Sequence, residues 1–142
     1  MIDRTRLISE MLAAARRTWH PRYDGEAREI AGFVAARVEA ALGPRSHDCV
    51  ITFERASLDA EWITNPLRGH AVRPGGYPQL RSLLASSSID SVPLAVASSG
   101  AGTVLWDGHR RLETYRAAGR PDVPVWHARF LTGSGSVRVA ST

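Results

Sequence analysis

The sequence predicts an α+β fold, in which a small mixed β-sheet is flanked by helices and preceded by an N-terminal helical hairpin. Two amphipathic stretches open the chain, with apolar residues at helical spacing. Short apolar runs bounded by glycine, serine and proline follow, and this pattern is typical of strands and turns. Because helix-like and strand-like segments then continue through the second half, we expect helices packed on one sheet.

The first two helices are predicted over residues 3–18 and 26–42. The apolar positions that share one face of the first helix are Leu7, Ile8, Met11, Leu12 and Ala15. Those of the second helix are Ile30, Phe33, Val34, Val38 and Leu42. Residues 19–25, Trp-His-Pro-Arg-Tyr-Asp-Gly, separate the two helices, and Gly43-Pro44 ends the second. This hairpin either covers the sheet or mediates dimerisation or the docking of a partner protein.

A strand over 49–53 and a short helical segment near 57–62 come next. Cys49 opens the strand, and we interpret it as a small buried hydrophobic residue and not as a nucleophile. A polar loop over 65–78 follows, which is long for a compact domain. Its basic side chains are Arg68, His70 and Arg73. The loop is either a mobile flap whose arginines reach a terminal phosphate of a ligand, or a solvated loop.

The remaining elements, in chain order, are a helix over 77–85, strands over 92–97 and 103–106, a helix that ends at Gly119, and a strand over 123–131. The inward residues of the first of these helices are Leu80, Leu83 and Leu84. The segment Ser-Ser-Gly-Ala-Gly between the first two strands fits a hairpin turn. Residues 132–142 either fray or add an edge strand at 137–139. We therefore divide the chain into a hairpin (1–45), a sheet domain (46–131) and a Gly- and Ser-rich tail (132–142).

Composition is that of an ordinary globular protein. The 142 residues are 44% hydrophobic and 23% charged, which suits one domain with its own core. A single cysteine excludes a disulfide framework and a cysteine-based metal site, and the five histidines show no paired metal-binding spacing. No apolar run approaches the roughly 18 residues that cross a bilayer, and the charged start, residues 1–4, does not resemble a signal peptide. We expect a cytoplasmic protein without a membrane partner and without a metal site of its own.

The positive charge is carried entirely by arginine. All 18 basic residues are arginines, and the formal net charge is +4. Guanidinium groups bind phosphate with paired hydrogen bonds, so the composition suits anionic partners such as nucleotides or nucleic acid. A compositional bias of the coding DNA would replace lysine by arginine just as well. In either case no lysine is present for a Schiff base or a P-loop.

The junction between the strand at 103–106 and the following helix carries the most chemical information. It reads Thr-Val-Leu-Trp, then Asp107-Gly108-His109-Arg110-Arg111. The first amides of a helix lack intrahelical partners and attract anions, and glycine lets the backbone approach a ligand. Asp107 is predicted to be the N-cap. Two arginines in a first turn oppose the helix dipole unless an anion compensates, so the junction is either a phosphate-binding turn or a common Asp-Gly turn with solvated arginines.

Two sequence boxes in the same order resemble the ParB/sulfiredoxin superfamily, over about residues 50 to 131. The first is Trp-Ile-Thr-Asn-Pro-Leu-Arg at 62–68. The second is the strand, the Asp-Gly-His-Arg-Arg turn and the helix, flanked by Val-Pro-Leu-Ala-Val before and Val-Pro-Val-Trp after. The corresponding turn reads Gly-Glu-Arg-Arg in partition proteins and Gly-Cys-His-Arg in sulfiredoxins. It reads Asp-Gly-His-His-Arg in the related free-serine kinases, which is the closest resemblance.

The resemblance implies that Gly108, His109, Arg110 and Arg111 contact the phosphates of a bound nucleotide, next to Asp107. His109 stands where sulfiredoxins have their reactive cysteine, so sulfiredoxin chemistry is excluded. The serine kinases place a glutamate that acts as a base just after the first box, where this chain has no carboxylate. Residues that could replace that base are Glu61, Asp59 and His70. Arg68 and Arg73 are further candidates for phosphate contact.

Three functions of different class follow from this resemblance. The first is a small phosphotransferase or nucleotide hydrolase that binds ATP, ADP or CTP with Mg²⁺, acts on a small-molecule acceptor and uses His109 as acid or base. The second is a nucleotide-gated DNA-binding module like the partition proteins, although no helix-turn-helix segment follows the last strand. The third is a regulatory protein that keeps the fold and has lost catalysis.

Overall fold

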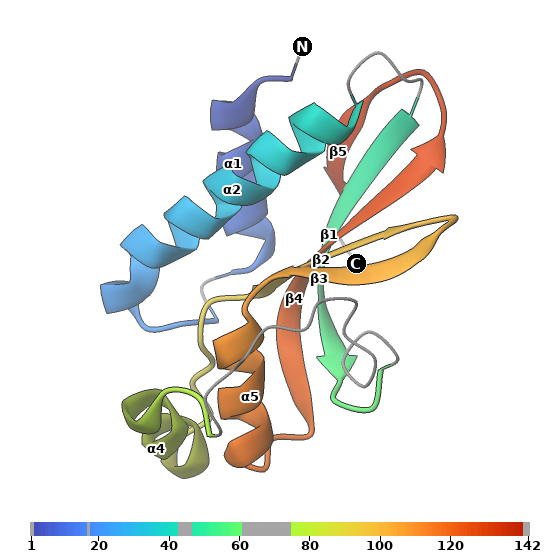
Figure 1. Cartoon of the computed structure of the whole chain (residues 1–142). Coiled ribbons are helices and arrows are strands. Elements are labelled where there is room, and N and C mark those ends of the chain that lie inside the picture. Colours follow the sequence, from blue (N-terminus) through green and yellow to red (C-terminus); the bar gives the residue numbers. More distant parts are fainter. Residues whose placement is uncertain (1, 17, 43–46, 61–74, 141–142) are drawn as a thin grey trace.

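The computed structural model describes residues 2–16, 18–42, 47–60 and 75–140. The helices in chain order are α1 (Arg4–Ala14), the short 3-10 helix η1 (Pro21–Tyr23), α2 (Asp24–Leu42), α4 (Pro78–Ser86) and α5 (His109–Ala117). The strands are β1 (His47–Ser57), β2 (Leu94–Ser99), β3 (Gly102–Asp107), β4 (Asp122–Thr132) and β5 (Val137–Ala140). The predicted α+β class, with a mixed sheet and an N-terminal helical hairpin, is confirmed (Figure 1).

The five strands form one mixed sheet in the order β3-β2-β4-β1-β5. The long strands β1 and β4 pair antiparallel along their whole length, from His47 opposite Thr132 to Ser57 opposite Asp122. Strands β2 and β3 form the predicted antiparallel hairpin, and β2 lies parallel to β4. Helix α5 therefore connects β3 to β4 across β2, which places its first turn at the end of β3.

The two helical pairs pack against opposite faces of the sheet. Successive strand residues point to opposite faces, and Ala95 and Trp126 belong to one core cluster whereas Leu94 and Val125 belong to the other. Helices α1 and α2 supply the first cluster with residues such as Met11, whose side chain is fully buried. Helices α4 and α5 cover the second, and Figure 1 shows the two helical pairs as separate groups.

Three local predictions need correction, and one pair of alternatives is decided. Strand β1 continues to Ser57, so the described part of the predicted helix near 57–62 is the end of a strand and a turn. Of the two alternatives for the segment after β4, the described residues show the edge strand, because Val137–Ala140 pairs with β1 in parallel. Asp48 anchors this strand by accepting hydrogen bonds from the amides of Gly135 and Ser136 at 3.0 and 2.9 Å. Phe33, predicted to face the core, is 40% exposed.

The last correction concerns the cap of α5. The N-cap is Gly108, which has a left-handed backbone (φ 109°, ψ 22°), and no side chain caps the helix. Asp107 was predicted at that position, but it is the final residue of β3.

Candidate functional site

The turn from β3 into α5 depends on glycine for two reasons. First, the φ of Gly108 is 109°, a value that residues with a side chain rarely adopt. Second, a Cβ at this position would lie 2.6 Å from Cγ of Leu94. The turn therefore packs directly against β2. The first intrahelical bond of α5 runs from the Leu112 amide to the Gly108 carbonyl at 2.8 Å. The amides of the first turn before Leu112 have no intrahelical acceptor.

A second close approach brings Tyr77 to the same turn. Gly76 has a φ of 64°, and a Cβ at this position would overlap Thr114 and the Arg110 carbonyl oxygen. The Tyr77 amide donates to Oγ1 of Thr114 at 2.9 Å, and that hydroxyl donates to the Arg110 carbonyl at 2.7 Å. The Arg110 guanidinium lies over the Tyr77 ring, 4.4 Å from its centroid. The Gly-Gly-Tyr segment is thus docked on the start of α5.

The two adjacent arginines point in different directions. Arg110 is exposed, whereas Arg111 is only 5% exposed. Nη1 of Arg111 donates to the carbonyls of Val92 and Pro93 at 2.8 and 2.9 Å, and Nη2 reaches Oδ2 of Asp107 at 3.3 Å. Burial lowers the pKa of Arg111, and the charges of Asp107 and Glu26 oppose that shift. Arg111 therefore anchors the segment before β2, and the expected pair of outward guanidinium groups is reduced to Arg110.

A cavity of about 470 Å³ lies between this turn and the N-terminal half of α2. Its lining residues are Glu26, Glu29, Ile30, Phe33, Tyr77, Asp107, Gly108, His109, Arg110 and Arg111. We call it the α2–α5 cavity. All five predicted residues of the Asp-Gly-His-Arg-Arg turn line it, so the concavity expected at this junction is present. Its wall on α2 adds two carboxylates, and the site is therefore mixed in charge instead of uniformly positive.

Five further residues were predicted for the site, and the structure describes one of them. Glu61, Arg68, His70 and Arg73 lie outside the described residues. Asp59 is exposed in the turn after β1, where its amide donates to Oγ of Ser57 at 3.1 Å, and it does not line the cavity.

Sequence reasoning missed the α2 side of the site. No role was predicted from the sequence for Glu26 or Glu29, and Phe33 was placed on the core face of its helix. The exposed rings of Phe33 and Tyr77 both line the α2–α5 cavity. Phe33 follows Glu29 by four residues, one helical turn, and this spacing was the available signal. The cavity that joins α2 to the start of α5 brings together residues far apart in sequence, and no local pattern contains it.

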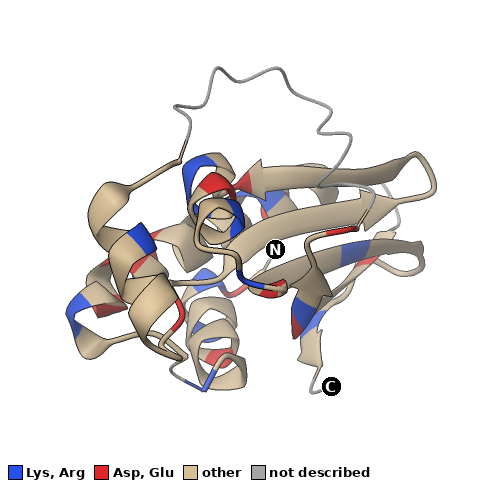
Figure 2. Cartoon of the chain, turned by 90° about the horizontal axis from the view of Figure 1, so that it is seen from below, with Lys and Arg blue, Asp and Glu red and all other residues tan. Residues whose placement is uncertain are grey.

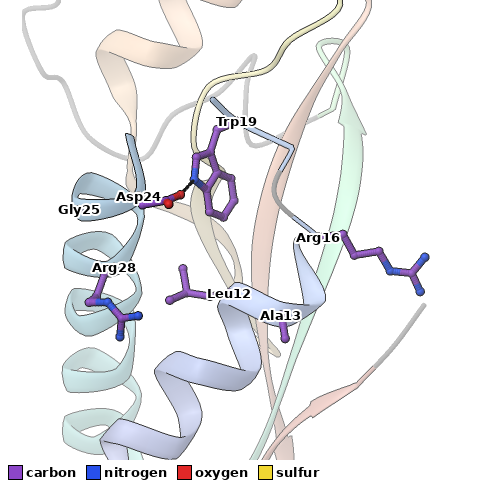
Figure 3. A pocket seen from close by; sticks show the side chains of 7 residues that line it. All are labelled: Leu12, Ala13, Arg16, Trp19, Asp24, Gly25 and Arg28. Atoms are coloured by element: carbon purple, nitrogen blue, oxygen red, sulfur yellow. Dashed lines mark hydrogen bonds between the residues drawn. The ribbon is translucent and has the colours of Figure 1, made fainter. Parts of the chain in front are cut away.

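Another cavity, of about 400 Å³, lies between the end of α1 and the start of α2 (Figure 3). Asp24 accepts a hydrogen bond from Nε1 of Trp19 at 2.8 Å, and the side chain of Arg16 extends away from this pair. None of the predicted site residues lines this cavity. The Trp19–Asp24 bond joins the segment between the helices to the start of α2, so this cavity belongs to the hairpin.

The remaining chemical expectations concern metals, the thiol and membranes. Among residues 2–16, 18–42, 47–60 and 75–140, no three His, Cys, Asp or Glu side chains come together as metal ligands. Cys49 is buried, and burial raises the pKa of its thiol to about 12, in agreement with its interpretation as a core residue. No helix in the described part of the chain is long and apolar enough to span a membrane.

Much of the arginine charge is neutralised within the molecule. In the part of the chain that the structure describes, seven arginines form ion pairs with carboxylates: Arg4, Arg6, Arg55, Arg111, Arg116, Arg120 and Arg129. Figure 2 shows basic and acidic segments interspersed over the helices and strands. Charge of both signs is therefore mixed, whereas a nucleic-acid interface concentrates one sign.

No protein-family model, curated protein or solved structure matches the chain.

Proposed function

We propose that this protein binds a nucleotide in the α2–α5 cavity and acts on its terminal phosphate, as a small phosphotransferase or nucleotide hydrolase. The observation that carries the proposal is the start of α5, a helix N-terminus without a side-chain cap that opens into a cavity beside Arg110. First-turn amides and the helix dipole favour an anion at this point. The resemblance of the Asp-Gly-His-Arg-Arg turn to the ParB/sulfiredoxin superfamily supports the same ligand class.

The α2 wall suits the nucleoside half of such a ligand. The rings of Tyr77 and Phe33 are 39% and 40% exposed and both line the cavity, so either can stack on a base. Glu26 and Glu29 line the same wall, and carboxylates accept hydrogen bonds from ribose hydroxyls. Phosphates at the start of α5 and a nucleoside against α2 therefore match the mixed charge of the site better than a bare polyanion does.

The catalytic contribution of the chain comes from positioning and charge. Arg110 is the exposed cation that stabilises negative charge building up on a transferring phosphate. His109, which lines the cavity, is the candidate acid or base. Mg²⁺ bound to the phosphates of the nucleotide would supply further charge neutralisation and needs few protein ligands.

Titration calorimetry with ATP, ADP and CTP, each with and without Mg²⁺, tests the binding step. We expect at least one nucleotide to bind wild-type protein, and Arg110→Ala to weaken that binding by at least tenfold. Arg116→Ala is the matched control, because Arg116 lies in the last turn of α5 and pairs with Glu113 at 3.2 Å. Its affinity should equal that of wild type. Absence of heat with all three nucleotides, or equal affinities in the two variants, would overturn the proposal.

Phosphate release in the presence of the nucleotide that binds separates catalysis from binding. A phosphotransferase or hydrolase releases or transfers phosphate, and His109→Gln should slow this step more than it weakens binding. Binding without turnover would assign the same cavity to a regulatory protein. Retardation of random DNA duplexes by the protein at low salt would instead favour the partition-like alternative.

A further inference from the structure

A second group of polar side chains lies on the sheet face that α5 and α4 cover only in part. The residues are Ser98 on β2, His127 and Arg129 on β4, and Thr52 and Glu54 on β1. The strand register places Ser98 opposite Arg129 and His127 opposite Thr52. Because directly opposite residues share a face, these five side chains stand on one surface formed by three adjacent strands. None of them lines the α2–α5 cavity.

The hydrogen bonds in this group form a chain from Ser98 through His127 to Glu54. Nε2 of His127 lies 2.7 Å from Oγ of Ser98, and Nδ1 lies 3.0 Å from Oε1 of Glu54. Oε1 of Glu54 also accepts from Nη2 of Arg129 at 2.8 Å and from the Thr52 hydroxyl at 3.2 Å. An oxygen that accepts from a guanidinium belongs to an ionised carboxylate, so Nδ1 of His127 carries a proton and donates it. Nε2 is then the acceptor, and the Ser98 hydroxyl donates to it.

The surroundings keep this histidine neutral and the serine accessible. The His127 side chain is 14% exposed, and burial together with the charge of Arg129 lowers its pKa, against the opposing effect of Glu54. A neutral imidazole is the form that can take a proton from a hydroxyl. Ser98 is half-buried near the end of β2.

We propose that Ser98 is an activated nucleophile for acyl esters, with His127 as its general base and Glu54 as the positioning residue that fixes the imidazole. The order serine, histidine, carboxylate matches the relay of nucleophilic hydrolases, which occurs on unrelated folds. Arg129 donates to Oε1 of Glu54 at 2.8 Å and to Oγ1 of Thr52 at 2.7 Å, and so holds the carboxylate beside the imidazole.

The proposed reaction needs only an ester and water as reactants. Oγ of Ser98 bonds to the acyl carbon while its proton moves to Nε2 of His127. The bond between the acyl carbon and the leaving oxygen breaks, and the alcohol departs with the proton from Nε2. Water then attacks the acyl–serine ester and gives its proton to Nε2. The carboxylic acid leaves, and the proton returns to Oγ of Ser98.

Replacing Ser98 by cysteine provides the sharpest test, because Cys49 is buried and its thiol pKa is raised to about 12. Alkylation of native Ser98→Cys by iodoacetamide, followed against pH, should show a midpoint at least one pH unit below the value of about 8.5 of an ordinary thiol. Adding His127→Gln should return the midpoint to about 8.5 or above. A midpoint that His127→Gln does not move would show that the imidazole only satisfies hydrogen bonds, and would overturn the proposal.

Labelling by a fluorophosphonate probe tests the serine itself. We expect an adduct on Ser98 in wild-type protein, none in Ser98→Ala, and labelling at least tenfold slower in His127→Gln. Glu54→Gln should shift the pH profile of labelling. Ser99→Ala is the control, since Oγ of Ser99 accepts from the Ala101 amide in the hairpin turn, and it should label as wild type does. Circular dichroism checks that each variant is folded. Absence of an adduct on Ser98, or an unchanged rate in folded His127→Gln, would contradict the proposal.

Discussion

Arg110 and Arg111 are neighbours in sequence and have opposite roles in the structure. An α-helix turns by about 100° per residue, so adjacent side chains cannot share a direction. Arg110 lies over the Tyr77 ring at the cavity, whereas Arg111 holds the carbonyls of Val92 and Pro93. The sequence predicted that arginines begin this helix, but their directions depend on β2, which packs beneath the turn. Binding is therefore tested at Arg110 and stability at Arg111.

Arg111→Ala should lower the free energy of unfolding by about 3 kcal/mol, since it leaves two buried carbonyls and Asp107 without their donor. Urea denaturation measures the difference. The control is Arg116→Ala, whose exposed ion pair with Glu113 contributes about 0.5 kcal/mol or less. Equal stability of the two variants would mean that the Arg111 side chain is not buried as described.

His127 should make stability depend on pH near neutrality. Burial and Arg129 lower its pKa in the folded protein, so the unfolded chain binds more protons as the pH falls. Stability is then complete above the ordinary histidine pKa of about 6.5 and is lost below it. Urea titrations between pH 8 and pH 5 should show wild-type protein losing stability relative to His127→Gln as the pH decreases. A gain in relative stability toward low pH would indicate a raised pKa instead.

At the scale of elements, the strand–turn–helix unit around Gly108 was predictable because its signals are local. An apolar run, a glycine and a helical period lie within a few residues of each other. The hairpin of β2 and β3 was predictable for the same reason. The docking of Gly76 and Tyr77 on Thr114 was not, because the contact joins residues far apart in sequence. The same holds for the α2 wall of the cavity, where Phe33 was expected in the core.

Two glycines with positive φ allow the energetic cost of backbone strain to be distinguished from that of steric overlap with neighbouring atoms. Gly108→Ala should cost about 3 kcal/mol, because it adds a Cβ 2.6 Å from Cγ of Leu94 to the strain of a φ of 109°. Gly119→Ala has a φ of 72° and open space around the new atom, so it should cost about 1 kcal/mol. Thermal unfolding of both variants provides the comparison. A larger loss for Gly119→Ala would contradict the close packing of the turn on β2.

At the scale of the whole molecule, the hairpin and the sheet share one core. Nε1 of Trp126 on β4 donates to the Met11 carbonyl on α1 at 3.1 Å, and Trp19 packs edge-on against Trp126 with ring centroids 6.2 Å apart. The apolar faces of both helices were predictable from their period. The strand order β3-β2-β4-β1-β5 was not, because pairing of strands distant in sequence leaves no local pattern.

Unfolding should therefore be a single transition that includes the hairpin. Met11→Ala should lower the free energy of unfolding by about 3 kcal/mol, the usual cost of truncating a fully buried side chain. Circular dichroism follows the helices, and tryptophan fluorescence follows the shared core. The two unfolding curves should coincide in wild-type protein and in Met11→Ala. An earlier transition in circular dichroism alone would mean that the hairpin unfolds independently of the sheet.

We propose that the start of α5 holds the phosphates of a nucleotide. The most direct measurement is an amide ¹H–¹⁵N spectrum of the protein titrated with ATP, ADP or CTP and Mg²⁺. We expect the amide signals of Gly108, His109, Arg110 and Arg111 to shift most, together with those of Tyr77 and the first turns of α2. Shifts confined to other parts of the chain, or an unchanged spectrum with every nucleotide, would contradict it.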